Sequence, residues 1–120
     1  MKQVIVLAAG LLSALAFADA PPAWNVPGGD AARGRAQIAR FGCGGCHTIP
    51  GIREANGNVG PPLTRIGDRA FVAGVLRNTP ENLVHWVMHP QQVVPGNAMP
   101  EMGISEAQAR DIAAYLYRLR

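Results

Sequence analysis

The chain has 120 residues, a length that fits one domain and is too short for a two-domain enzyme with a dinucleotide-binding fold. Hydrophobic residues make up 48% and charged residues 16%, so the chain is neither disordered nor highly charged. Glycine contributes 14 residues and proline 10, which predicts long loops between few helices.

The first 18 residues have the pattern of a secretory signal peptide. Lys2 precedes an apolar run at 4–18, which ends in small residues. A helix of this run would span ~22 Å, less than the ~30 Å hydrocarbon core of a bilayer, so cleavage is favoured over an uncleaved anchor. We therefore predict a signal peptide at 1–18, a leader segment at 19–29 and one domain at 30–120. The expected location is the periplasm, with no stable membrane insertion once the signal is removed.

Export leaves a weakly charged chain. Lys2 is the only lysine, and without it ten arginines face eight acidic residues, a formal charge of +2. This charge is too small and too dispersed to indicate nucleic-acid binding. No basic stretch carries the apolar face of a membrane-surface helix.

Local signals predict the first and second helices. Asp30 is a candidate N-cap for a helix from Ala31 to about Phe41, which ends at Gly42. Thr79-Pro80-Glu81 begins a second helix, with Thr79 as the N-cap and a proline in the first position. Pro90 ends this second helix.

The last helix has the clearest pattern. Ser105 and Gln108 fit a capping box, and an apolar stripe follows at helical spacing. The stripe consists of Ala109, Ile112, Ala113, Leu116 and Leu119.

The remaining segments are predicted as loops. These are 48–63 and 91–103, whereas 63–76 is ambiguous and holds at most a short helix from Asp68. No alternating strand pattern is present, so the expected fold is all-α, with three or more helices and long loops. Such loops bury few apolar groups, so the chain has little with which to form a core. A large apolar cofactor at the centre is the simplest way to supply the missing apolar surface.

The segment Cys43-Gly44-Gly45-Cys46-His47 is C-x-x-C-H, the attachment pattern of c-type haem. Each thiol can add to one vinyl group of the porphyrin, and His47 can coordinate the iron through Nε2. A disulfide across a two-residue gap would close only a tiny loop and stabilise little. The predicted cofactor is one haem c, covalently bound through Cys43 and Cys46.

Two other uses of these residues are weaker. A zinc site could combine Cys43 and Cys46 with His85 and His89, but 38 residues separate Cys46 from His85, far more than in a compact zinc finger. A thiol oxidoreductase would need strands before the motif. His85 and His89 could also supply a bis-histidine haem, although such a row is more often a solvated helix face.

A sixth ligand decides what the iron does, because a second strong ligand leaves no open position. Three methionines remain after the signal peptide. Met88 lies in the second predicted helix, Met102 lies just before the last one, and Met99 ends a loop stiffened by two prolines.

From about Gly29 to the C-terminus, the chain resembles the small class I c-type cytochromes. Within them it is similar to bacterial monohaem cytochromes and to the cytochrome c domains fused to terminal oxidase subunits. The matching segments are Gly29-Asp30-Ala31-Ala32-Arg33-Gly34, the C-x-x-C-H motif, Gly60-Pro61-Pro62-Leu63, Pro95-Gly96-Asn97-Ala98-Met99-Pro100 and Ala113-Ala114-Tyr115-Leu116.

The resemblance implies a role for each matching residue. Met99 matches the axial methionine, so His47 and Met99 would be the metal ligands. Pro61 matches the proline whose carbonyl accepts a hydrogen bond from the ligand histidine, which would fix the ring of His47. Leu63 matches an apolar residue on the haem face, and Trp86 an aromatic residue near the methionine side.

Further matches concern packing and charge. Gly34 and Tyr115 match the contact where the first and last helices cross. The stretch 65–76 matches only the oxidase-linked branch. Within it, Arg65 and Arg69 could pair with haem propionates, although a solvated arginine is the more common reading of each taken alone.

The predicted function is electron transfer, with haem iron cycling between Fe(II) and Fe(III) under His/Met ligation. The chain would be an electron carrier rather than an enzyme. It could act alone or as the electron-transfer subunit of an oxidoreductase complex. Expected partners are a redox donor and acceptor such as a terminal oxidase, a respiratory complex or a dehydrogenase. The alternative is a haem-based gas sensor with an open sixth position.

Overall fold

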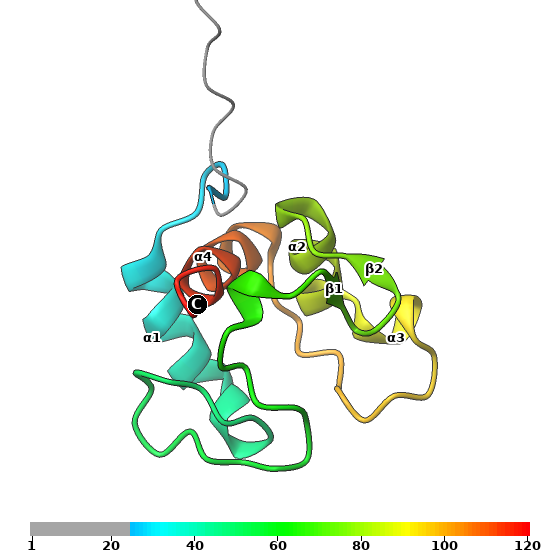
Figure 1. Ribbon diagram of the computed structural model, residues 1–120, viewed down its shortest axis with the longest axis horizontal. Helices are drawn as coiled ribbons and strands as arrows, with labels where there is room; N and C mark the ends of the chain where they lie inside the picture. The colour runs from blue at the N-terminus through cyan, green and yellow to red at the C-terminus, as the bar shows by residue number, and fades with distance from the viewer. Residues whose placement is uncertain (1–24) are drawn as a thin grey trace, which may run out of the picture.

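The computed structural model describes residues 25–120 (Figure 1). The predicted signal peptide at 1–18, and the leader as far as Trp24, lie outside these residues. In chain order, the elements are the helix α1 (Ala31–Phe41), the 3₁₀ turns η1 (Cys43–Gly45) and η2 (Ile66–Asp68), the strands β1 (Phe71–Val72) and β2 (Leu76–Arg77), and the helices α2 (Pro80–Met88), α3 (Pro90–Val93) and α4 (Glu106–Leu116).

The first helix forms as its end signals predict. The Asp30 side chain accepts a hydrogen bond from the Arg33 N–H at 2.8 Å, which satisfies one of the free donors of the first turn. At the other end Gly42 adopts a left-handed conformation, with φ 71°, and its N–H bonds back to the carbonyl of Ala39. The predicted bounds of α1 are therefore confirmed.

The capping box of α4 is also present. The Ser105 hydroxyl accepts from the Gln108 N–H at 3.2 Å, and the Gln108 side chain accepts from the Ser105 N–H at 3.0 Å. The stripe of the last helix faces the core, where Ala109, Ile112, Ala113 and Leu116 are buried, while Leu119 lies beyond the helix end and is partly buried.

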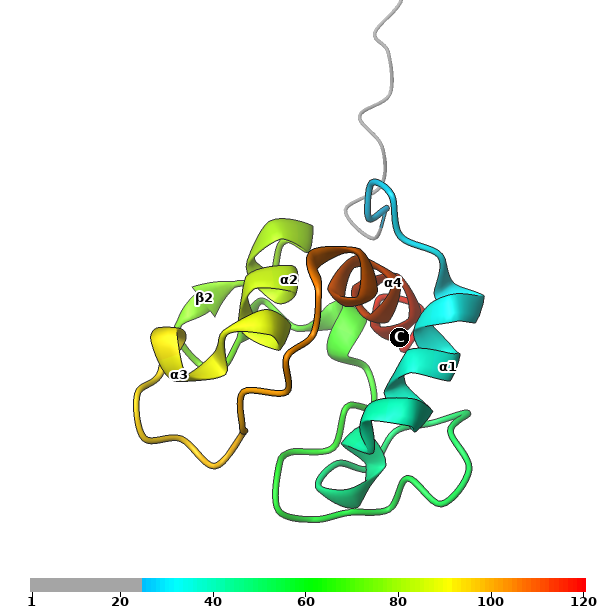
Figure 2. The same ribbon diagram turned by 180° about the vertical axis from the view of Figure 1, so that it is seen from behind.

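Helices α1 and α4 cross at a glycine, and Figure 2 shows the pair from behind. A Cβ atom at Gly34 would overlap the carbonyl oxygen of Asp111, so only glycine permits this backbone approach. The predicted crossing of the first and last helices is present, and Gly34 faces the backbone of Asp111. The Tyr115 hydroxyl donates to the Pro50 carbonyl at 2.6 Å.

A buried carboxylate ties the same two helices together. Arg33 donates to both oxygens of Asp111 at 2.9 Å, and the Asp30 N–H donates to Asp111 at 2.8 Å. Hydrogen bonding to Arg33 holds the pKa of Asp111 below its usual value, and the same bond raises the pKa of Arg33. Both groups are therefore charged at neutral pH.

Helix α2 begins at the predicted cap, where Thr79 accepts from the Asn82 N–H at 3.2 Å. It packs against α4 through its buried residues Leu83, Val84 and Val87. Its C-cap is His89, and Pro90 follows as predicted.

The ambiguous segment at 63–76 and one predicted loop contain regular structure. The short helix allowed in the ambiguous segment is present as η2, but it ends at Asp68 rather than beginning there, and an antiparallel hairpin follows, pairing Phe71 with Arg77 and Val72 with Leu76. The strands are two residues each, too short to show an alternation. Pro90 ends α2 but also begins the single turn α3, inside a segment predicted as loop. The fold is thus mostly helical with one small sheet.

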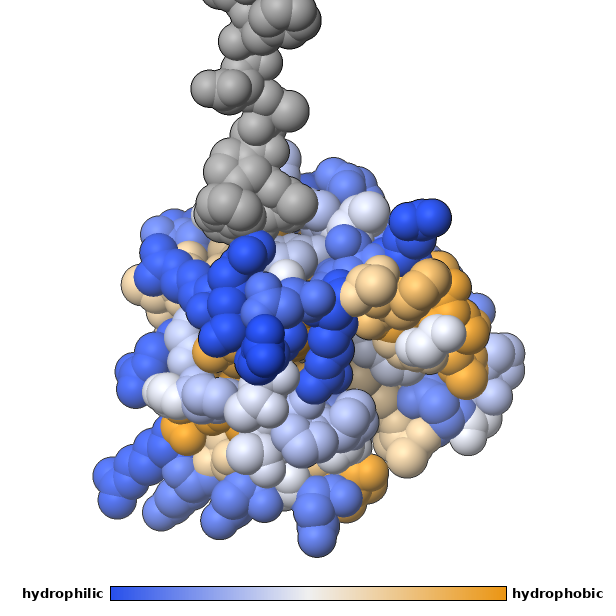
Figure 3. Space-filling model, in the orientation of Figure 1, coloured by the Kyte–Doolittle hydropathy of each residue, from blue (hydrophilic) through white to orange (hydrophobic). Residues whose placement is uncertain are grey.

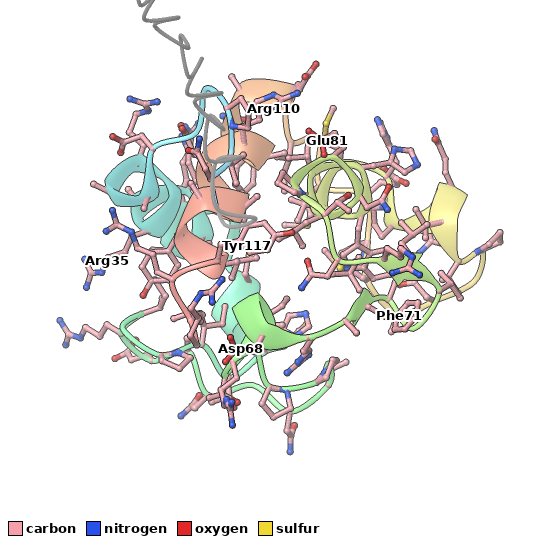
Figure 4. All side chains as sticks on the ribbon, turned by 45° about the horizontal axis from the view of Figure 1, so that its top comes forward. Arg35, Asp68, Phe71, Glu81, Arg110 and Tyr117 are labelled. Carbon is pink, nitrogen blue, oxygen red and sulfur yellow. The ribbon has the colours of Figure 1, made fainter. Side chains whose placement is uncertain are left out.

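Asn78, which directly follows β2, links the segment before β1 to the buried Tyr117. Its amide donates at 2.8 Å to the carbonyls of both Ile66 and Arg69, and its oxygen accepts from the Tyr117 hydroxyl at 2.7 Å. Figure 4 shows Tyr117 near the centre of the molecule and Phe71 out on the hairpin. Burial, with a contribution from Glu81, raises the pKa of Tyr117 to about 12, so this hydroxyl stays protonated.

Among residues 25–120, no helix combines the length and apolar character needed to cross a membrane.

Candidate cofactor site

The C-x-x-C-H motif lies on the tight turn that follows α1. The N–H groups of Cys46 and His47 both bond to the Cys43 carbonyl, at 3.2 and 3.0 Å. Cys43 and Cys46 are free and half-buried. Burial raises the pKa of the Cys43 thiol. One turn therefore presents two thiols and an imidazole together.

The loop after the motif folds back against this turn with little space between the two. The Gly57 N–H bonds to the Gly44 carbonyl at 2.9 Å, and the Gly60 N–H bonds to the Cys46 carbonyl at 2.8 Å. A Cβ atom at Gly44 would overlap Ala55, and one at Gly60 would overlap the His47 ring. The absence of a side chain at Gly44 therefore makes room for this loop.

His47 has a defined orientation. Its Nδ1 lies 2.7 Å from the carbonyl oxygen of Pro61. A carbonyl can only accept, so Nδ1 carries the hydrogen, and Nε2 of the neutral ring keeps a free lone pair. The hydrogen bond implied by the resemblance is therefore present, and it fixes the orientation of the His47 ring.

All seven predicted site residues line one cavity of about 490 Å³, a size in the range of small-molecule and cofactor pockets. Its wall includes residues of the loop that follows α1 and of the loop that follows α3. Figures 1 and 2 show these two loops opposite each other. The seven residues are Cys43, Cys46, His47, Pro61, Leu63, Trp86 and Met99.

Further apolar residues complete the wall. Phe41 comes from the end of α1, Val59 from the loop before Pro61, Phe71 from β1 and Val94 from the end of α3. Phe71 remains 52% exposed, and Figure 3 shows hydrophobic surface gathered over this hairpin. Sequence reasoning missed these residues, although a single apolar residue among loop glycines, such as Val59, is a signal that could have identified one.

Two methionines reach the cavity. Met99 is half-buried, whereas Met102 is 36% exposed at the rim. Met88 does not line the cavity. Asn97 shapes the backbone before Met99, because its side-chain oxygen accepts from the Met99 N–H at 2.7 Å.

The histidines of the weaker alternatives lie elsewhere. The rings of His85 and His89 are 5.7 Å apart, and His89 is 3.6 Å from Glu101, but neither histidine lines the cavity. Residues 25–120 contain no cluster of three or more His, Cys, Asp or Glu side chains able to hold a metal ion.

The two candidate arginines have different surroundings. Arg69 lines the cavity and donates to the carbonyls of Pro62 and Thr64. Arg65 is exposed and pairs with Asp68 at 3.3 Å. Only Arg69 is placed to meet a group inside the cavity.

The attachment turn, the oriented imidazole and the helical frame place the chain among the class I c-type cytochromes. It belongs to the family of cytochrome c oxidase, cbb3-type, subunit III, whose model matches residues 29–116. Membership implies that the chain binds haem and carries electrons.

Individual proteins that are similar to this chain are also subunits of cytochrome c oxidases. The chain is 37% identical over 89 residues to cytochrome c oxidase subunit 2 of Alkalihalophilus pseudofirmus, covering 73% of this chain and 25% of the relative. It is 35% identical over 82 residues to the subunit of the same name in Bacillus sp. strain PS3, covering 65% and 23%. The chain thus spans about a quarter of the length of these relatives.

Proposed function

We propose that this chain is an electron carrier that holds one haem c covalently through Cys43 and Cys46, with His47 and Met99 as the axial ligands. The observation that carries the proposal is the His47–Pro61 hydrogen bond, because it leaves Nε2 free in a cavity that Met99 also lines. When bound, the haem supplies a reversible one-electron couple between Fe(III) and Fe(II).

The residues of this chain fit such a group. The two free thiols lie at the cavity wall with two residues between them in the sequence. The wall is largely apolar, with Leu63 and Trp86 among its residues, and so suits a large apolar cofactor. Arg69 is the cation in this wall that can pair with a carboxylate of the cofactor.

The reaction moves one electron and makes no bond. A donor protein loses the electron, this chain holds it, and an acceptor protein gains it. The role of the protein is to keep both ligands in place in both oxidation states. The relatives are oxidase subunits, which supports a terminal oxidase as one partner. A respiratory complex or dehydrogenase would be the other, in the periplasm after removal of residues 1–18.

The test is the absorption spectrum of protein exported from a host that matures c-type haem. We expect a sharp reduced α band and the weak red ferric band of sulfur-to-iron charge transfer. Met99→Ala should abolish the red band and give a high-spin ferric spectrum. Met102→Ala, a matched change at the rim of the same cavity, should keep the band.

Other outcomes would change the assignment. Loss of the red band in Met102→Ala alone would make Met102 the ligand. A low-spin wild-type spectrum without that band would indicate two nitrogen ligands, and a high-spin one would favour the gas-sensor alternative. Absence of haem would overturn the proposal.

A further inference from the structure

The segment that carries Met99 has almost no backbone hydrogen bonding of its own. No helix or strand covers residues 94–105. Within 95–104 a single backbone-to-backbone hydrogen bond is formed, from the Asn97 N–H to the Val94 carbonyl at 3.2 Å. Side chains must therefore hold this loop in place.

Gln91 on α3 supplies three of these contacts from outside the loop. Its side-chain nitrogen donates to the carbonyls of Asn97 and Met99, both at 2.8 Å. Its side-chain oxygen accepts from the Gly96 N–H at 3.0 Å. The side-chain amide of Gln91 thus uses both N–H donors and one acceptor lone pair to bind the backbone of residues 96–99.

The loop is fastened on both sides of Met99. Beyond Pro100, the Glu101 side chain accepts from the backbone N–H of Gln91 at 3.2 Å. Before Met99, the Asn97 amide donates to the carbonyl of Pro90 at 2.9 Å. All these bonds converge on the first turn of α3.

That turn is itself anchored in the core. Pro90 is buried, and α3 packs on α2, whose Leu83 and Val87 are core residues. Gln91 therefore connects the rigid part of the fold to the backbone of Met99. Gln92, the next residue, is exposed and makes no side-chain hydrogen bond within residues 25–120.

We propose that Gln91 is a positioning residue for Met99 and controls how readily the methionine leaves the iron. This inference rests on the proposed function. Release of Met99 requires the loop to move, and the two bonds from the Gln91 amide to the loop carbonyls resist that movement. At a typical strength for each bond, their loss makes the released state about tenfold or more easier to populate.

Binding of exogenous imidazole reports the fraction of protein in which Met99 has left the iron. Imidazole binds ferric iron only when Met99 has left, so its apparent affinity scales with the released fraction. The experiment titrates the ferric holoprotein with imidazole and follows the red sulfur-to-iron band. The variants are Gln91→Met, which keeps the volume without hydrogen bonds, and Gln91→Glu, which presents oxygen to the two carbonyls. Gln92→Met is the matched control.

We expect about tenfold or more tighter imidazole binding in both Gln91 variants and an unchanged affinity in Gln92→Met. Unchanged affinity in the Gln91 variants, or an equal increase in the control, would overturn the inference. If Gln91→Met does not fold, Gln91→Glu carries the test. A wild-type protein that binds haem but lacks the red band fails earlier, at the assignment of Met99, so the two failures are distinguishable.

Discussion

The α1–α4 pair and the Met99 loop are fixed by different kinds of contact. Where the helices cross, the two backbones touch at Gly34 and a buried carboxylate, Asp111, joins them. The loop has no such packing and is held by the half-buried amides of Gln91 and Asn97, which bond to backbone groups.

Because of this difference, changes in the two regions should affect different properties, namely the free energy of unfolding and ligand binding at the cavity. Disturbing the helix crossing removes contacts on which the whole fold depends, so it should lower the free energy of unfolding. Disturbing the loop changes a region with few buried groups, so it should alter ligand binding at the cavity with little global effect. Variants in each region can test this separation.

The largest effect is expected for Gly34→Ala. Helix propensity alone predicts that Gly→Ala within α1 stabilises by about 0.5–1 kcal/mol. The added Cβ atom would instead overlap the Asp111 carbonyl and force the helices apart, and we expect a loss of about 3 kcal/mol or more. Urea unfolding of the holoprotein measures the change.

The test is whether Gly34→Ala lowers or raises the free energy of unfolding. An alanine-to-glycine change at an exposed site of the same helix is the control. Ala36 lies on the exposed face of α1, and Ala36→Gly should cost only the propensity difference of about 1 kcal/mol. A stabilised Gly34→Ala protein would show that the helices do not approach as closely as described.

Asp111→Asn should cost less, about 2 kcal/mol at neutral pH. The carboxylate of Asp111 is only 8% exposed, while its partner Arg33 is 62% exposed, so solvent weakens but does not remove the pairing. Because hydrogen bonding to Arg33 lowers the pKa of Asp111, its stabilisation is complete above the unfolded value of about 3.9 and is lost as pH falls through the lower folded pKa.

Urea midpoints between neutral and strongly acidic pH should therefore converge for the wild type and Asp111→Asn as the pH falls. Asp68→Asn is the matched control, because Asp68 pairs on the surface with Arg65 at 3.3 Å and with Arg120 at 3.5 Å, and exposed pairs of this kind contribute little. A constant difference between wild type and Asp111→Asn at every pH would mean that the charge of Asp111 is not what stabilises the crossing.

Local signals in the sequence were sufficient for α1, α2 and α4 and for the C-x-x-C-H motif in the cavity wall. Caps act within a few residues, so Asp30, Thr79 and Ser105 could be recognised without any knowledge of the fold. The C-x-x-C-H motif has a fixed spacing for a chemical reason. The other predicted site residues came from a resemblance that covers most of the domain.

Contacts between distant segments could not be predicted in this way. The partner of Asp111 lies 78 positions earlier, and nothing near Gln91 indicates which carbonyls its amide reaches. The β1–β2 hairpin has strands too short for a pattern, while Ala73 and Gly74, with φ 53° and 71°, form the turn between them. Pro90 carries two signals, since a proline ends one helix and favours the first position of the next.

The smallest effect is expected for Arg69→Gln. Arg69 lines the cavity, so its removal takes a positive charge away from the redox centre and favours the oxidised state, which is the more positive one. At the ~0.3–1 kcal/mol typical of a partly solvated charge, the midpoint potential should fall by about 10–40 mV. Arg65→Gln removes the same charge from an exposed site paired with Asp68 and should shift the potential less. Protein-film voltammetry of both variants measures this, and equal shifts would mean that only net charge matters and that Arg69 has no special place in the wall.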